Sequence, residues 1–423
     1  MGDQAVSIRV AGGKSARSPN PDTQYLVTDS LSLLSGFHPP FSVRYSEIEI
    51  DIPHSEMSSR LHPPLHPTFS FCRFLGIFDN NAFLPLNVRR ILLIRTDRIG
   101  DVVLTLPMVD IVRKQWPGAE VSFLVREYTR ELVEHHLGIS HVLVIDRQGV
   151  PRPRAELLSE IRRMGFDVAV HVYPRPQLAW LTTQARIPVR VGTAYRWYSF
   201  LFNRKARDHR KAGDRHEAVL NARLLRPLGV DTPDVVRPAL FPCDRHVTSA
   251  EQVRPELGLK ASEPFVILHP GTGGSSKDWP ASRFAELAAG LARTMKVVVT
   301  GNTQEEQLVR QIVNGSGGVA HACVGRFSLM ELAAFIKTAR LFISNSTGPL
   351  HIAAAVGTPV IGFYPPLAAA SVTRWGPLGD RVATFTPDRR KCPQCHGGIC
   401  SGNVCMEQIS VESVAEAAKE LIG

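Results

Sequence analysis

Residues 90–116 read RILLIRTDRIGDVVLTLPMVDIVRKQW and join a short apolar run to a longer amphipathic segment. The run RILLIR is typical of a buried strand, whereas VVLTLPMVDIVRKQW places apolar residues at helical spacing. Between them, Asp101 directly follows a glycine, with Arg95 and Arg98 just upstream. A strand, a turn and a helix in this order predict the first unit of a parallel α/β sheet.

The alternation of strand patterns and helix patterns continues and then restarts further along the chain. Strand patterns in the first half are EVSFLV, HVLVID and FDVAVHV, and those in the second half are FVILHP, KVVVTG, LFISN and PVIGFY. A segment rich in proline and charge, residues 231–264, separates the two series. We therefore predict an α/β fold with two Rossmann-like parallel-sheet domains, residues 88–245 and 246–423. Their ligand site is expected in the cleft at the carboxyl ends of the strands.

Residues 1–87 differ from the remainder, because stretches such as FHPPFSV and RLHPPLHPTF show no sustained period. They predict a poorly ordered extension. No run is long and apolar enough to span a membrane, and the first residues lack the apolar core of a signal peptide, so a cytoplasmic location is expected. The net charge of +10 indicates an acidic partner, such as a phosphate, a nucleic acid or an anionic membrane surface.

A glycine- and serine-rich turn follows the strand pattern in FVILHPGTGGSSKDWP, residues 265–280. Backbone N–H groups in such a turn, next to Lys277, suit a phosphate or diphosphate. The phosphate-loop motif fails because Ser276 stands where glycine is needed, and the dinucleotide fingerprint lacks its third glycine. The alternative is a turn that serves only as a tight connection.

A second turn lies in LFISNSTGPLHIAAAVGTPV, residues 341–360. Ser346 and Thr347 are candidate capping hydroxyls, and the helix that starts near Gly348 offers free N–H groups to an anion. His351, one turn into that helix, fits a ligand contact and a half-buried structural histidine equally well.

Basic and aromatic residues alternate in ARIPVRVGTAYRWYSFLFNRKARDHRKAGDRH, residues 185–216. This pattern suits an amphiphilic, phosphorylated partner or a membrane interface, and the alternative is a solvated basic loop. No recognised nucleic-acid module surrounds the stretch. The candidate contacts to such a partner are Arg204, Lys205, Arg207, Arg210 and Lys211.

Four cysteines gather in CPQCHGGICSGNVC, at positions 392, 395, 400 and 405. A four-thiolate zinc site could use this spacing, but it is not a standard finger spacing. We favour reduced thiols over metal ligands.

Four blocks together resemble glycosyltransferase family 9, the lipopolysaccharide heptosyltransferases: RTDRIGDVVLTLP, HPGTGGSSKDWP, SNSTGPLHIAAAVGTPVIGFY and the cysteine-rich tail. The resemblance covers residues 88 to about 420 and implies a GT-B fold with an N-terminal acceptor domain and a C-terminal nucleotide-sugar domain. It implies inverting transfer of a sugar, usually heptose from ADP-heptose, to a lipid-linked core oligosaccharide, with no metal and no cofactor. It also implies that the C-terminal helix, SVESVAEAAKELI, returns to the first domain.

Carried over by position, the resemblance makes Asp101 the general base. It assigns Lys277, Thr347, Gly348 and His351 to the donor. The residues of the two turns add Thr272, Gly273, Ser276 and Ser346 as candidate donor contacts. One departure concerns the donor sugar, because heptosyltransferases often carry an aspartate where this chain has Ser346, and family members with other donors share such a serine.

The sequence thus predicts an inverting, metal-independent glycosyltransferase that builds a cell-surface glycan from the cytoplasmic face of the inner membrane. Its expected partners are a nucleotide sugar, a phosphorylated lipid-linked acceptor and an anionic membrane surface, with no nucleic acid. The alternatives are a GT-B epimerase acting on a nucleotide sugar, and a non-catalytic protein that binds nucleotide sugars or lipids.

Overall fold

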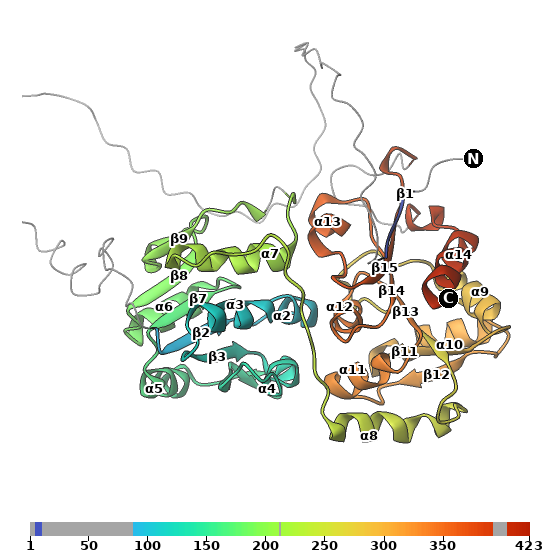
Figure 1. Ribbon diagram of the computed structural model, residues 1–423, viewed down its shortest axis with the longest axis horizontal. Coiled ribbons are helices and arrows are strands. Elements are labelled where there is room, and N and C mark those ends of the chain that lie inside the picture. Colours follow the sequence, from blue (N-terminus) through green and yellow to red (C-terminus); the bar gives the residue numbers. More distant parts are fainter. Residues whose placement is uncertain (1–4, 11–87, 211–212, 392–403) are drawn as a thin grey trace, which may run out of the picture. The chain divides into compact units, whose positions relative to one another are not determined.

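The computed structural model describes residues 5–10, 88–210, 213–391 and 404–423, which all belong to one compact unit. Figure 1 shows that these residues form two β-sheets, each accompanied by its own helices. Lys211 and three cysteines of the C-terminal cluster, Cys392, Cys395 and Cys400, lie outside the described residues.

Six parallel strands form the first sheet, in the order β4-β3-β2-β7-β8-β9. Their bounds are Arg90–Ile94 (β2), Glu120–Val125 (β3), His141–Val144 (β4), Val168–His171 (β7), Val189–Thr193 (β8) and Arg204–Ala206 (β9). The accompanying helices are α2 (Ile99–Val103), α3 (Pro107–Gln115), α4 (Glu131–Glu134), α5 (Arg154–Met164), α6 (Pro176–Gln184) and α7 (Glu217–Ala222). Two short strands, β5 (Asp146–Arg147) and β6 (Val150–Pro151), pair as a separate antiparallel ribbon.

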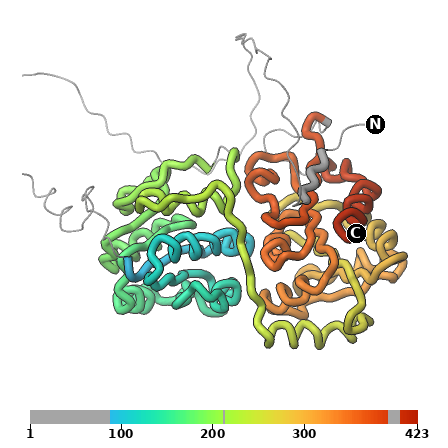
Figure 2. Tube along the Cα trace, viewed as in Figure 1, coloured from blue at the N-terminus to red at the C-terminus, as the bar shows by residue number. Residues whose placement is uncertain are grey.

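The second sheet has the order β1-β15-β14-β13-β10-β11-β12, with every neighbouring pair parallel except β1 and β15. Its strands are β1 (Ala5–Val10), β10 (Phe265–His269), β11 (Lys296–Gly301), β12 (His321–Val324), β13 (Leu341–Asn345), β14 (Val360–Phe363) and β15 (Arg381–Thr386). Its helices are α8 (Asp244–Val253), α9 (Ala281–Leu291), α10 (Glu306–Gly315), α11 (Leu329–Lys337), α12 (Gly348–Ala355), α13 (Val372–Trp375) and α14 (Val411–Ile422). Residues 230–243, which hold neither helix nor strand, connect the first sheet to α8 (Figure 2).

Both faces of each sheet are covered, which explains why the strands read as continuous apolar runs. In β2, Ile91 and Leu93 belong to one hydrophobic cluster, and Leu92 and Ile94 belong to another. The first of these clusters also contains Phe265 of β10 and therefore continues from one domain into the other.

Each sheet reverses its strand order beside the first of its parallel strands. Strand β2 lies between β3 and β7, and β10 lies between β11 and β13. Ligands of open α/β sheets bind at such switch points, outside the carboxyl ends of the strands. The residues after β2, β10 and β13 are therefore placed to form a site.

Three sequence expectations need correction. The segment after β2 is not one helix, because Pro107 lacks the N–H needed to continue it, and α2 and α3 form instead. The C-terminal helix does not return to the first domain, since α14 packs on α9 and its buried residues belong to the core of the second sheet. Residues 5–10, expected in a poorly ordered extension, are strand β1 at the edge of the second sheet.

A chain that begins at Leu86 tests what the preceding residues contribute. We expect it to keep both parallel sheets, since strands β2 to β15 all come from later residues, and to melt only a few degrees lower. It should also associate more readily, because the edge of β15 loses its antiparallel neighbour. Circular dichroism melting and light scattering would check both points. Loss of cooperative unfolding would contradict this account.

Candidate functional site

The turn after β2 brings a carboxylate to the carboxyl end of the first sheet. Asp101 lies in the first turn of α2, and its side chain is 14% exposed. The N-terminal turn of α2 packs closely on that of α12 in the second domain. A Cβ atom on Gly100 would lie 2.7 Å from Cδ2 of His351, and one on Gly348 would lie 2.7 Å from Cβ of Ile99. Glycine at both positions thus allows the two helices to touch.

A buried asparagine fixes the two turns of the second domain. Asn345, at the end of β13, donates from Nδ2 to the carbonyl oxygen of Pro270 at 2.6 Å. Its Oδ1 accepts from the backbone N–H of Trp279 at 2.8 Å. Both ends of the glycine-rich turn after β10 are thereby held against the turn after β13.

Two adjoining cavities lie where these turns meet α2. The larger cavity, of about 430 Å³, falls within the usual size range of ligand pockets. It is lined mostly by the second domain, with Arg98, Ile99 and Tyr128 from the first. The smaller cavity, of about 200 Å³, contains Asp101. Four residues line both cavities and mark their junction: Arg98, Ser275, Thr347 and Gly348.

The structure brings most of the predicted donor residues to these cavities. Thr272 and Gly273 line the larger cavity, Ser346 and His351 line the smaller one, and Thr347 and Gly348 line both. Ser276 and Lys277 are not among the residues that line either cavity. Thr347 is the N-cap residue of α12, but its side chain makes no capping hydrogen bond, unlike the capping role expected for it.

His351 lies in the smaller cavity as a neutral imidazole. It is buried, and burial, together with the nearby His216, lowers its pKa to about 3. Within the described part of the chain, its Nδ1 has no hydrogen-bond partner. A neutral ring at this position can donate or accept one hydrogen bond at physiological pH.

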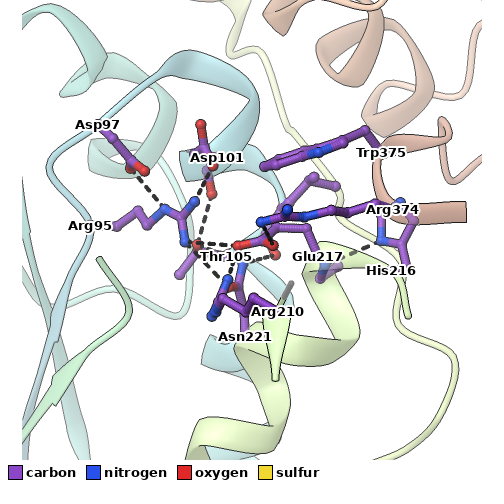
Figure 3. Close-up of polar contacts among 12 residues, drawn as sticks. Arg95, Asp97, Asp101, Thr105, Arg210, His216, Glu217, Asn221, Arg374 and Trp375 are labelled. Carbon is purple, nitrogen blue, oxygen red and sulfur yellow. Dashed lines mark hydrogen bonds and ion pairs between the residues drawn. The ribbon is translucent and has the colours of Figure 1, made fainter. Parts of the chain in front are cut away.

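Arg95 orients Asp101 (Figure 3). This buried guanidinium pairs with Asp101 through Nη2 and with Asp97 through Nε at 2.8 Å. Burial raises the pKa of Asp97 to about 6, and Arg95 opposes that rise. The ion pair with Arg95 holds the Asp101 carboxylate in one place.

The buried carboxylate of Glu217, at the start of α7, lies among three arginines (Figure 3). It pairs with Arg95 at 3.5 Å, with Arg210, and with Arg374 of the second domain at 3.4 Å. The preceding residue, His216, donates from Nε2 to the carbonyl oxygen of Gly376 at 2.8 Å. Two polar contacts therefore join α7 to the region around α13.

The predicted partner-binding residues separate into two groups. Arg210 reaches the site, where it pairs with Glu217 and donates to Asn221 Oδ1 at 3.0 Å. Burial, with the neighbouring Arg95 and Arg374, lowers its pKa to about 9, so it remains charged at neutral pH. Arg204 and Lys205 begin the edge strand β9, and Arg207 directly follows it. Lys205 and Arg207 are exposed.

Sequence reasoning missed several residues of this site. Glu217 directly follows the basic stretch of residues 185–216 and was not selected, although an acid at the start of the helical run EAVLNA could have indicated a helix N-terminus. Arg374 and Trp375 follow no motif, and Trp375 lines the smaller cavity. Ser275 lines both cavities, whereas its neighbour Ser276 was selected instead.

The family model described as glycosyltransferase family 9 (heptosyltransferase) matches residues 154–402, more than half of the chain. The chain belongs to glycosyltransferase family 9. A lipopolysaccharide heptosyltransferase 3 of Escherichia coli is 26% identical over 308 residues, which cover 70% of this chain and 88% of the relative. The predicted family is confirmed, and glycosyl transfer is the reaction class of its members.

Solved structures of family 9 proteins share this fold. The family 9 glycosyl transferase from Veillonella parvula has a TM-score of 0.69 and 24% identity, over 81% of this chain and 99% of its own. The solved structure of an Escherichia coli heptosyltransferase with ADP has a TM-score of 0.61 and 19% identity, over 78% of this chain and 99% of its own. The predicted GT-B architecture of two Rossmann-like domains is confirmed. Among the described residues of this family 9 chain, no helix is long and apolar enough to cross a membrane.

Replacing Gly348 by alanine tests the contact between α2 and α12. The new Cβ would lie 2.7 Å from Cβ of Ile99, so α2 must shift and carry Asp101 with it. We expect turnover to fall about 10- to 100-fold, because even a small displacement of a reacting group lowers the rate by such a factor. Gly290→Ala in α9 is the matched control, because open space surrounds that position. Equal kinetics for the two variants, measured as nucleotide release, would refute the proposed constraint.

Replacing Glu217 by glutamine should lower the free energy of unfolding by about 2 to 3 kcal/mol, because it leaves Arg95 and Arg210 less compensated. Breaking a fully buried ion pair costs about 3 to 5 kcal/mol. The expected loss is smaller here because Arg210 and Arg374 are partly exposed. Urea unfolding would measure the loss, with Glu251→Gln, an exposed glutamate of α8, as the control. An unfolding midpoint equal to that of the control would show that Glu217 is not central to the cluster.

Proposed function

We propose that this chain transfers a sugar, heptose from ADP-heptose, with inversion, onto a phosphorylated core oligosaccharide of lipopolysaccharide. The observation that carries the proposal is the position of Asp101, an oriented carboxylate in a small cavity that adjoins a larger one at the carboxyl ends of both sheets. The heptosyltransferase names of the family relatives support the choice of sugar.

In the proposed reaction, Asp101 accepts the proton of an acceptor hydroxyl as the oxygen attacks the anomeric carbon of the donor. A new glycosidic bond forms, the bond from that carbon to the diphosphate breaks, and the nucleoside diphosphate leaves. Attack from the face opposite the diphosphate inverts the anomeric configuration. The ion pair with Arg95 gives the Asp101 carboxylate a defined orientation.

The donor nucleoside fits the larger cavity. Glu305 lines it and is the kind of carboxylate that accepts hydrogen bonds from ribose hydroxyls, while Phe327 and Leu332 offer apolar contacts to a base. ADP is our choice of nucleotide because the solved structure of an Escherichia coli heptosyltransferase of the same fold is with ADP. The diphosphate would lie at the N-terminus of α12, where backbone N–H groups suit an anion. The assignment of Ser276 and Lys277 to the donor rests on the sequence alone.

The acceptor is proposed to approach from the first domain. Arg210 lies near Asp101. Arg204 and Lys205 in β9, and Arg207 directly after it, add further positive charge, which suits phosphates on the acceptor. Lys211 completes this set by sequence. Exposed aromatic side chains lie nearby in the chain, with Trp197 79% exposed and Phe200 48% exposed. Aromatic and basic residues together suit contact with an anionic membrane surface.

Asp101→Asn tests the proposed base. Asparagine keeps the shape of the side chain but accepts no proton, so turnover with ADP-heptose and a core acceptor should fall roughly 10²- to 10⁴-fold. The affinity for ADP, measured by calorimetry, should stay near that of the wild type.

The matched control is Asp110→Asn, which changes an exposed carboxylate in the first turn of α3. If Asp101 serves only as a favourable charge at a helix N-terminus, both variants lose little activity. Near-normal turnover of Asp101→Asn would thus remove the base from the proposal. A glycosidic product with retained anomeric configuration would contradict inversion.

A further inference from the structure

We infer that Arg98 binds the donor diphosphate from the first domain and stabilises it as the leaving group. The inference rests on the proposed function, which places the nucleoside in the larger cavity and the sugar beside Asp101. A diphosphate joining these two parts must pass the junction of the cavities. Arg98, Ser275, Thr347 and Gly348 line this junction, and Arg98 is the cation among them.

The backbone places Arg98 at this junction. It is the N-cap residue of α2, in an extended conformation with φ −92° and ψ 165°, three residues before Asp101. The contact between Ile99 and Gly348 brings this turn against the start of α12. A ligand at the N-terminus of α12 would therefore meet Arg98 from the opposite domain.

The surroundings of Arg98 leave its charge available to a ligand. The carboxylate of the neighbouring Asp97 pairs with Arg95, at 2.8 Å. Within residues 88–210, 213–391 and 404–423, no carboxylate lies within ion-pair distance of the Arg98 guanidinium, and its side chain is exposed. The Tyr128 ring lines the same cavity and donates its hydroxyl to the Asp97 carbonyl oxygen at 2.6 Å, which fixes the turn next to Arg98.

Arg98 can stabilise the negative charge that develops on the leaving group. As the anomeric bond breaks, negative charge grows on the β-phosphate oxygen, and a guanidinium can donate two parallel N–H bonds to a phosphate. Lys277, the cation that the sequence selects for this task, does not line either cavity. A cation contributed by the first domain also couples donor binding to the approach of Asp101, because the two residues share one turn.

Calorimetry of ADP and AMP with Arg98→Gln tests this assignment. We expect ADP to bind about 10- to 100-fold more weakly than to the wild type and AMP to bind equally well, because only ADP carries the β-phosphate at the junction. Arg98→Lys should recover part of the loss, since it keeps the charge but not the paired donors. Turnover of Arg98→Gln should fall at least as much as its affinity for ADP.

Arg89→Gln is the matched control, since Arg89 is an exposed arginine that directly precedes β2, whereas Arg98 follows that strand. Unchanged ADP binding by Arg98→Gln would overturn the inference while leaving the proposed function in place. Equal losses for ADP and AMP would also overturn it, because they would move Arg98 away from the β-phosphate. If the wild type binds neither ADP nor another nucleoside diphosphate, the proposed function itself fails.

Discussion

Helices α2 and α12 touch through their first turns, where Gly100 meets the ring of His351 and Gly348 meets Cβ of Ile99. This contact places Asp101, which follows β2 of the first sheet, next to the turns that follow β10 and β13 of the second sheet. A side chain at either glycine would separate them. The two cavities, the residues they share and the position of Arg98 all depend on this approach of two helix N-termini.

The charges behind Asp101 form a second layer that supports it. Arg95, Arg210 and Arg374 face Asp97, Asp101 and Glu217, so three cations compensate three carboxylates. Such a cluster holds side chains in fixed positions, and its value lies in orientation more than in stability, because desolvating these charges offsets much of their attraction. Since Arg374 belongs to the second domain, the orientation of Asp101 also depends on how that domain contacts α7.

The sequence predicted those parts of the fold that depend on local pattern. Apolar runs such as RILLIR revealed the buried strands, and most of the donor residues selected from the two turns line one of the cavities. Strand β12, HACV, is short and partly polar, and β9 lies among basic residues, so neither gave a strand signal. The partners of Glu217 and the packing of α14 arise from contacts between distant segments, which no local period encodes. The roles assigned to Asp101 and to the donor residues remain predictions.

A crystal structure with ADP bound would show whether the adjacent N-termini of α2 and α12 form the donor site. We expect the adenosine to occupy the larger cavity and the β-phosphate to lie within about 3 Å of backbone N–H groups at the start of α12, on the side that faces Asp101. The Arg98 guanidinium should reach the same phosphate. ADP bound away from the junction, or with its β-phosphate directed away from Asp101, would contradict the account.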